Sequence, residues 1–151
     1  SREQAQRTER AFCRWLDMVA ADATHLYLMG DIFDFWFEYR RVAPKGFVRV
    51  LGRLAELTDR GVRVTLYTGN HDMWCYDYFE RECGIEVVKS PRVECIAGKR
   101  LHLAHGDNMN IRGNLLLRLM NATFRSPVAR WLFSWLVHPD LICKLMLSNS
   151  I

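Results

Sequence analysis

The first 70 residues alternate between two kinds of hydrophobic pattern. Apolar residues three and four positions apart predict one helix around Phe12 to Val19 and another from after Pro44 to near Gly61. Short apolar runs at 25–29 and 62–67 predict buried strands, because each is nearly continuous and soon followed by a glycine. The order helix, strand, helix, strand indicates an α/β fold with a parallel sheet flanked by helices.

After residue 70 the elements become shorter and then strongly apolar. A third helix is predicted at 73–83, with Gly84 as its C-terminal stop, followed by short strands within 85–104. The pattern from 114 to 150 is helical, and Ser126-Pro127 is typical of a helix N-terminus. We therefore expect a core and a separate apolar helical segment.

Composition narrows the class of protein without identifying it. The chain has 151 residues, 50% of them hydrophobic, which is enough for a packed core. A net charge of +4 does not call for a nucleic-acid partner, and we expect none. Five cysteines without a C-x-x-C pair favour reduced thiols in the cytoplasm. The longest apolar stretch, 128–147, is interrupted by charged residues and a proline, so it is not expected to cross a bilayer as a helix.

Three predicted strands each end in a loop that contains possible metal ligands. The loops are Gly30-Asp31-Ile32-Phe33-Asp34, Gly69-Asn70-His71-Asp72 and His105-Gly106-Asp107. The carboxyl ends of neighbouring parallel strands meet at one crevice, which is where ligands bind in α/β sheets. We therefore expect Asp31, Asn70 and His105 to lie around one point.

This combination of ligands predicts a particular chemistry. Carboxylate, amide and imidazole groups together suit Mn²⁺, Fe²⁺ or Zn²⁺. Two such ions, about 3.5–4 Å apart, can clamp a phosphate during attack by water, and a bridging Asp31 can bind both. His71 follows a proposed ligand and is expected to point at the phosphate, with Asp72 orienting its imidazole.

Each loop also has a purely structural explanation. Gly30-Asp31 can be an ordinary turn, and His105-Gly106-Asp107 a hydrogen-bonded one. Asn70 can cap a helix that starts near Met73. Asp34 can cap a loop without contacting metal. The occurrence of all three loops at strand ends favours the metal site over these alternatives.

The three motifs, G-D-x-x-D, G-N-H-D and a later H-G-D, resemble those of the calcineurin-like metallophosphoesterases over roughly residues 20 to 110. Within that family, residues 30–36 and the apolar helices after 107 are similar to the UDP-2,3-diacylglucosamine hydrolases of the lipid A pathway. The resemblance implies an α/β/β/α sandwich with a helical lid inserted after the third metal loop. We therefore expect a metallophosphoesterase core at 1–111 and an apolar lid at 112–151.

The resemblance also implies a role for each matching residue. Asp31 is expected to bridge two metal ions, and Asn70 and His105 to bind the second of them. His71 is expected to be catalytic, and Trp36 to lie beside the substrate. The cofactor is expected to be two divalent ions, Mn²⁺ first, with Fe²⁺ or Zn²⁺ as alternatives.

The sequence departs from the family in three places. The D-x-H motif that opens the family and the G-H-x-H motif that closes it are both absent. The best-studied branch of the lipid enzyme has arginine at the position of His71. We interpret the chain as an internal part of a longer protein and expect it to bind metal poorly and to be inactive alone.

The expected reaction of the parent protein is hydrolysis of UDP-2,3-diacylglucosamine to lipid X and UMP. Two alternatives stay open: a metallophosphoesterase for soluble nucleotides or phosphoproteins, and a non-catalytic scaffold of the same fold. The apolar residues after 112, including Trp131 and Trp135, either pack on other parts of the core or form a lid for acyl chains. The lid interpretation predicts a cytoplasmic protein that is peripheral on the inner membrane. We infer no obligate protein partner.

Overall fold

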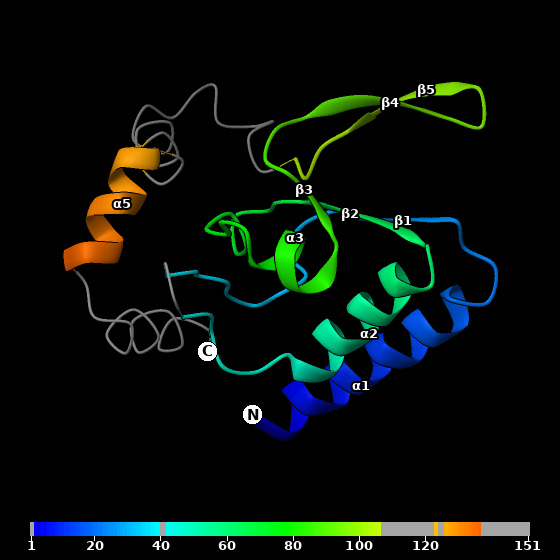
Figure 1. The fold of residues 1–151 in the computed structure, drawn as a ribbon, viewed down its shortest axis with the longest axis horizontal. Coiled ribbons are helices and arrows are strands. Elements are labelled where there is room, and N and C mark those ends of the chain that lie inside the picture. The colour runs from blue at the N-terminus through cyan, green and yellow to red at the C-terminus, as the bar shows by residue number, and fades with distance from the viewer. Residues whose placement is uncertain (1, 40–41, 107–122, 124–125, 137–151) are drawn as a thin grey trace. The chain divides into compact units, whose positions relative to one another are not determined.

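The computed structural model describes residues 2–39, 42–106, 123 and 126–136, and the chain forms two compact units. The first unit comprises residues 1–38 and 43–105, and the second comprises 39–42 and 106–151. Figure 1 labels the elements: α1 (Arg2–Val19), β1 (His25–Leu28), α2 (Val48–Asp59), β2 (Arg63–Tyr67), α3 (Tyr78–Cys83), β3 (Glu86–Val88), β4 (Arg92–Ile96), β5 (Lys99–Leu103) and α5 (Pro127–Leu136). The first two predicted helices and strands, and the α/β class, are confirmed.

Three parallel strands form the central sheet of the first unit, in the order β1-β2-β3. Leu26 pairs with Val64 and Leu28 with Leu66, so these four side chains share one face of the sheet. All four are at most 6% exposed. This face of the sheet is therefore part of the hydrophobic core.

Helices α1 and α2 lie side by side and pack on this apolar face (Figure 1). Each helix has a stripe of apolar residues at helical spacing that faces the core. Leu16 lies in the stripe of α1 and Leu54 in that of α2, and both side chains are at most 1% exposed. At the rim, Arg53 and Asp17 form an ion pair of 3.0 Å between the two helices. The buried stripes stabilise the pair far more than this exposed ion pair does.

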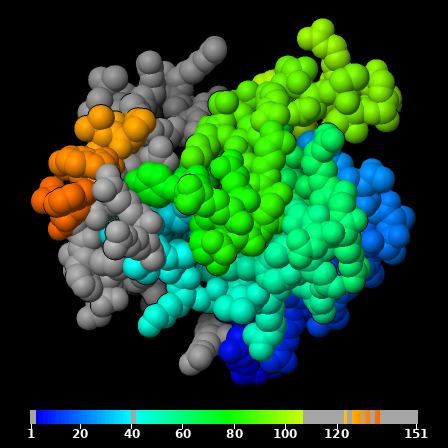
Figure 2. Space-filling model, viewed as in Figure 1, coloured from blue at the N-terminus to red at the C-terminus, as the bar shows by residue number. Residues whose placement is uncertain are grey.

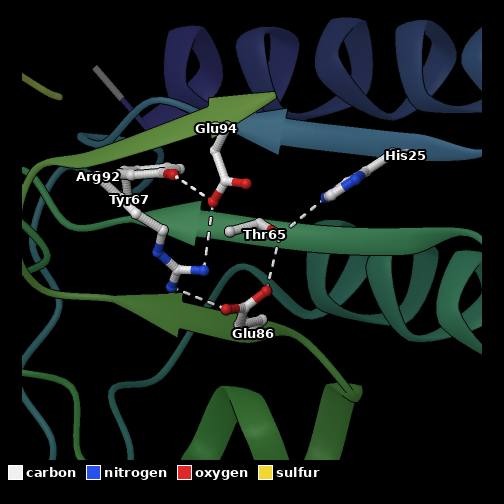
Figure 3. Close-up of polar contacts among 6 residues, drawn as sticks. All are labelled: His25, Thr65, Tyr67, Glu86, Arg92 and Glu94. Atoms are coloured by element: carbon white, nitrogen blue, oxygen red, sulfur yellow. Dashed lines mark hydrogen bonds and ion pairs between the residues drawn. The ribbon is translucent and has the colours of Figure 1, made fainter. Parts of the chain in front are cut away.

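The opposite face of the sheet is polar and aromatic (Figure 3). Six residues form its network: His25, Thr65, Tyr67, Glu86, Arg92 and Glu94. Arg92 of β4 donates to Glu86 of β3 at 2.8 Å, and the Tyr67 hydroxyl donates to Glu94 of β4 at 3.3 Å. Side-chain contacts thus tie β4 to a sheet with which it shares no described backbone pairing.

The prediction of three neighbouring parallel strands is wrong for the third strand. The strand before His105 is β5, which pairs antiparallel with β4 in a separate two-stranded sheet. Ala97 and Gly98 connect β4 and β5, and both have a positive φ, at 51° and 75°. A two-residue turn of this kind matches the right-handed twist of a hairpin, so it favours the antiparallel partner. Figure 2 shows the hairpin protruding from the rest of its unit.

The third helix is shorter than predicted, because α3 begins at Tyr78 and not near Met73. Trp74 instead pairs with Phe37 in an isolated bridge, and the backbone N–H groups of residues 76–78 donate to the Glu38 carboxylate. The N-cap position of α3 is Asp77, so Asn70 does not cap this helix.

The second unit contains α5, which begins where Ser126-Pro127 predicts a helix start. The Ala129 N–H donates to the Ser126 hydroxyl at 3.4 Å, as an N-cap serine requires. Trp131 and Trp135 are 48% and 68% exposed, with ring centroids 6.0 Å apart. Asp107, the predicted boundary at 111/112 and most of the expected lid lie outside the described residues. None of the helices that the structure describes has the length and apolar character needed to cross a membrane.

Candidate metal and catalytic site

The loops that follow β1 and β2 approach so closely that two glycines are required. A Cβ on Gly69 would collide with the Asp31 carboxylate, and a Cβ on Gly30 would collide with the His105 ring. Asp31 itself has a φ of 52°, a left-handed conformation that is costly for a residue with a side chain. Such strain persists only where the surroundings fix it, and it often marks functional sites.

The Asp31 and His105 side chains meet beside these glycines, although 73 other residues separate them in sequence. The His105 Nε2 lies 3.2 Å from the Asp31 Oδ2, and both side chains are partly exposed. On the other side of the ring, Nδ1 lies 2.7 Å from the carbonyl oxygen of Met29. A carbonyl can only accept, so Nδ1 carries a proton and donates it.

The position of the proton on the His105 ring bears on whether Asp31 and His105 can bind a metal ion. In the neutral ring, the lone pair of Nε2 faces a carboxylate oxygen, so two acceptors point at each other. A cation between them, either a proton or a metal ion, relieves that conflict. A ligating histidine commonly donates its other N–H to a carbonyl, as His105 does to Met29. The donor chemistry of Asp31 and His105 therefore fits a divalent ion.

Asn70 lies between two residues that contact Asp31. Gly69 packs against the carboxylate, and the His71 backbone N–H donates to the Asp31 Oδ1 at 3.0 Å. Asn70 is exposed. Within the described parts of the chain, no three His, Cys, Asp or Glu side chains converge as a metal cluster. The ligand role of Asn70 stays a prediction.

His71 is oriented by the main chain and not by Asp72, so that part of the prediction is wrong. Its Nδ1 lies 2.7 Å from the carbonyl oxygen of Asp34, so this nitrogen is the donor. Nε2 is left for other partners, and the residue is exposed. The Asp34 backbone thus fixes the tautomer of His71 in the same way that Met29 fixes that of His105.

Asp72 connects the two loops instead. It is completely buried, and its carboxylate accepts the N–H of Gly69 at 2.6 Å and that of Ile32 at 3.1 Å. Burial raises the pKa of the Asp72 carboxyl, and the two N–H groups oppose that rise. Because Gly69 and Ile32 belong to different loops, Asp72 cross-links the segments that carry Asp31 and His71. The sequence alone had indicated an imidazole partner here.

Trp36 does not lie at the surface of the site, in contrast to its predicted contact with substrate. The residue is 1% exposed, and its ring packs against Phe33, Tyr78 and Phe79. Its indole N–H donates to the buried Glu38 carboxylate at 2.8 Å. Trp36 is therefore a core residue in this structure.

A hollow of about 780 Å³ opens beside Asp31 and Asp34, between the first turns of α1 and the start of α2. Lys45 and Arg49 line it, and Arg49 lies 3.9 Å from Glu9, a distance that allows only a weak ion pair. Glu9, Asp31 and Asp34 also line the hollow, so its charged side chains are of both signs.

Comparison with known proteins shows which proteins the chain resembles. No protein-family model matches it. It is 43% identical over 131 residues to a UDP-2,3-diacylglucosamine hydrolase of Porphyromonas gingivalis, covering 87% of this chain and 50% of that protein. The relative is a hydrolase of the calcineurin-like metallophosphoesterase family, and the chain is homologous to about half of it.

Further relatives within this metallophosphoesterase family carry the same name. The chain is 34% identical over 124 residues to the UDP-2,3-diacylglucosamine hydrolase of Azotobacter vinelandii, covering 82% of the chain and 50% of the relative. It is 32% identical over 126 residues to that of Pseudomonas aeruginosa, covering 81% and 50%. The chain thus spans about half the length of the curated relatives it matches. The predicted family resemblance is confirmed.

Proposed function

We propose that the full-length protein containing this chain hydrolyses the pyrophosphate of UDP-2,3-diacylglucosamine with water, releasing UMP and the diacylglucosamine phosphate, lipid X. The observation that carries the proposal is the 43% identity to a hydrolase of that name, over a region that includes the Asp31–His105 pair. A carboxylate and an imidazole held 3.2 Å apart, at glycines that tolerate no side chain, support a metal-dependent reaction.

The proposed metal ligands are Asp31, bridging two ions, with Asn70 and His105 on the second. Mn²⁺ is the expected ion, because carboxylate, amide and imidazole donors suit an ion of intermediate hardness, and Fe²⁺ or Zn²⁺ fits the same donors. When bound, a pair of divalent ions supplies Lewis-acid stabilisation of phosphoryl oxygens and lowers the pKa of water. The chain's own contribution is a rigid frame, since Met29, Gly30 and Gly69 fix how Asp31 and His105 face each other.

His71 is the proposed catalytic residue. Its Nδ1 is held by the Asp34 carbonyl, and its backbone N–H by Asp31, so the ring has one orientation relative to the proposed metal ligands. Nε2 can then hold a proton at the phosphate, where it stabilises negative charge or protonates the leaving group. Positioning of this kind is a large part of catalysis in phosphoryl transfer.

We also propose that the apolar segment after 112 forms a lid for the acyl chains and brings the protein to the cytoplasmic face of the inner membrane. The described part of that segment supports this proposal, because α5 exposes Val128, Trp131, Leu132, Trp135 and Leu136. Exposed tryptophans with neighbouring leucines suit a lipid interface.

The test is UMP release by the purified full-length protein with Mn²⁺, on UDP-2,3-diacylglucosamine and on its unacylated analogue. We expect release from the acylated substrate and much slower release from the analogue. Equal or faster turnover of the soluble analogue would favour a nucleotide phosphoesterase instead. No UMP release with Mn²⁺, Fe²⁺ or Zn²⁺ would reject the proposal.

A further inference from the structure

Glu38 is a buried carboxylate for which the proposed reaction has no direct use. It follows Phe35-Trp36-Phe37 in the sequence and is 3% exposed. Burying a carboxylate is costly unless hydrogen-bond donors replace the water it loses. Its partners therefore indicate what the residue does.

The donors to Glu38 come from one side chain and one stretch of backbone. The indole N–H of Trp36 donates to Oε1 at 2.8 Å. The backbone N–H groups of Tyr76, Asp77 and Tyr78 point at Oε2, at 2.5, 3.1 and 3.4 Å. A carboxylate that accepts several backbone N–H groups fixes the conformation of that backbone strongly, because each donor left unpaired inside the protein is unfavourable.

The same segment is joined to the candidate site by a short backbone ladder. The Trp36 N–H donates to the His71 carbonyl at 2.8 Å, and the Glu38 N–H donates to the Trp74 carbonyl at 2.9 Å. Phe37 and Trp74 are paired between these two bonds. His71 stands at one end of the ladder and the Glu38 carboxylate closes the other end.

We propose that Glu38 is a positioning residue for the hydrolysis: its carboxylate clamps residues 76–78 and, through the ladder at 36–38 and 71–74, holds His71 against Asp31 and Asp34. This inference rests on the proposed function for its catalytic consequence. Its structural consequence, the order of the 71–78 segment, can be measured without any reaction.

The test compares Glu38→Gln, Glu38→Asp and Leu54→Ala in the full-length protein. Glutamine keeps the size and shape of the glutamate side chain, but it replaces one carboxylate oxygen by an NH₂ group, which cannot accept the N–H groups that Glu38 binds. Aspartate keeps both carboxylate oxygens on a side chain that is one carbon shorter. Leu54, which is 0% exposed in α2, lies outside the ladder segments 36–38 and 71–74 and serves as a control for general destabilisation of the core.

Two readouts are taken. Hydrogen exchange of the metal-free protein is expected to be about tenfold or more faster at 74–78 in Glu38→Gln, with β2 unchanged. The kinetic assay is run at temperatures at which each variant is folded. There, kcat is expected to fall about 100-fold in Glu38→Gln and less in Glu38→Asp, because misplacing a catalytic group by about 1 Å has effects of this size. KM is expected to stay within about threefold of the wild-type value in both variants. Leu54→Ala is expected to lower the unfolding temperature without changing kcat.

Unchanged exchange at 74–78 in Glu38→Gln would overturn the clamp, and so would a kcat equal to that of the wild type. An equal loss of kcat in Leu54→Ala would show that Glu38 is merely structural. If Glu38→Gln does not fold, Glu38→Asp carries the same two readouts. If the wild type itself releases no UMP, the proposed function fails, and exchange at 74–78 still decides whether Glu38 clamps the segment.

Discussion

The loops at the ends of β1 and β2 and the β4–β5 hairpin are both polar, yet they are held in different ways. In the loops, the carboxylates of Glu38 and Asp72 are at most 3% exposed and accept backbone N–H groups from a second segment. In the hairpin, Val93 and Leu101 are 52% and 41% exposed, and side-chain contacts attach it to the sheet. Buried carboxylates fix a backbone, whereas exposed pairs contribute little rigidity.

This difference bears on function, because a catalytic group needs a fixed position and a connecting hairpin does not. Asp31, His71 and His105 are all oriented by backbone groups of the loops. Equivalent substitutions in the two regions should therefore have unequal effects.

The largest difference is expected between two histidines. His71→Gln should reduce kcat for UMP release by the full-length protein about 100-fold, because a positioned proton donor contributes that much. His102→Gln, on the exposed surface of β5, should leave kcat within about twofold. Steady-state assays of both variants measure this. Equal kcat values for the two variants would remove His71 from the mechanism.

The second comparison concerns carboxylates and stability. Asp72→Ala leaves the buried N–H of Gly69 and the partly buried N–H of Ile32 without their acceptor, so the free energy of unfolding should fall by about 3 kcal/mol. Glu94→Ala, which removes a contact of the hairpin with Tyr67, should cause a much smaller loss. Urea unfolding followed by circular dichroism measures both. A larger loss for Glu94→Ala would reverse our view of the two regions.

A third pair compares identical valines. Val64 of β2 is 1% exposed and Val93 of β4 is 52% exposed. Val64→Ala should lower the free energy of unfolding by about 2 kcal/mol through lost burial and a cavity. Val93→Ala should change it by less than about 0.5 kcal/mol. Urea unfolding of the 151-residue chain tests this, and comparable losses would mean that the hairpin is packed as tightly as the sheet.

The smallest effect is expected from His25, on the sheet face below the hairpin (Figure 3). Partial burial and then the charge of Arg63 lower the pKa of His25. The folded state thus favours the neutral His25 ring. The contribution of His25 to the free energy of unfolding is therefore complete above the pKa of the residue in the unfolded chain, about 6.5, and it declines as the pH falls toward the lower pKa of the residue in the folded chain. NMR titration should give a pKa below about 6.5, and His25→Gln should flatten this slight pH dependence. A pKa above that value would contradict the described packing.

The sequence predicted the elements that repeat a simple period. The apolar stripes of α1 and α2 and the runs of β1 and β2 depend on local spacing, and the structure confirms them. The pairing of the third strand was missed because its partner is decided by the Ala97-Gly98 turn and not by its apolar residues. The start of the third helix was missed because Glu38, distant in sequence, takes the N–H groups of 76–78.

The site was predictable as a set of motifs, but the partners of its side chains were not. Asp31 and His105 meet as predicted, although the strand before His105 pairs antiparallel in a separate sheet. Hydrogen bonds decide the rest: Asp72 binds backbone and not His71, and Trp36 turns inward to Glu38. The sequence does contain one indication of the role of Glu38, because this carboxylate directly follows three aromatic residues. A carboxylate that is buried among aromatic residues is expected to have hydrogen-bond partners.

The most direct test of this account is Mn²⁺ binding to the full-length protein, measured by electron paramagnetic resonance titration without substrate. Single Asp31→Ala and His105→Gln variants should each weaken the binding at least about tenfold, while His102→Gln should bind as the wild type does. Wild-type Mn²⁺ affinity in both Asp31→Ala and His105→Gln would show that the close approach of these two side chains does not form a metal site.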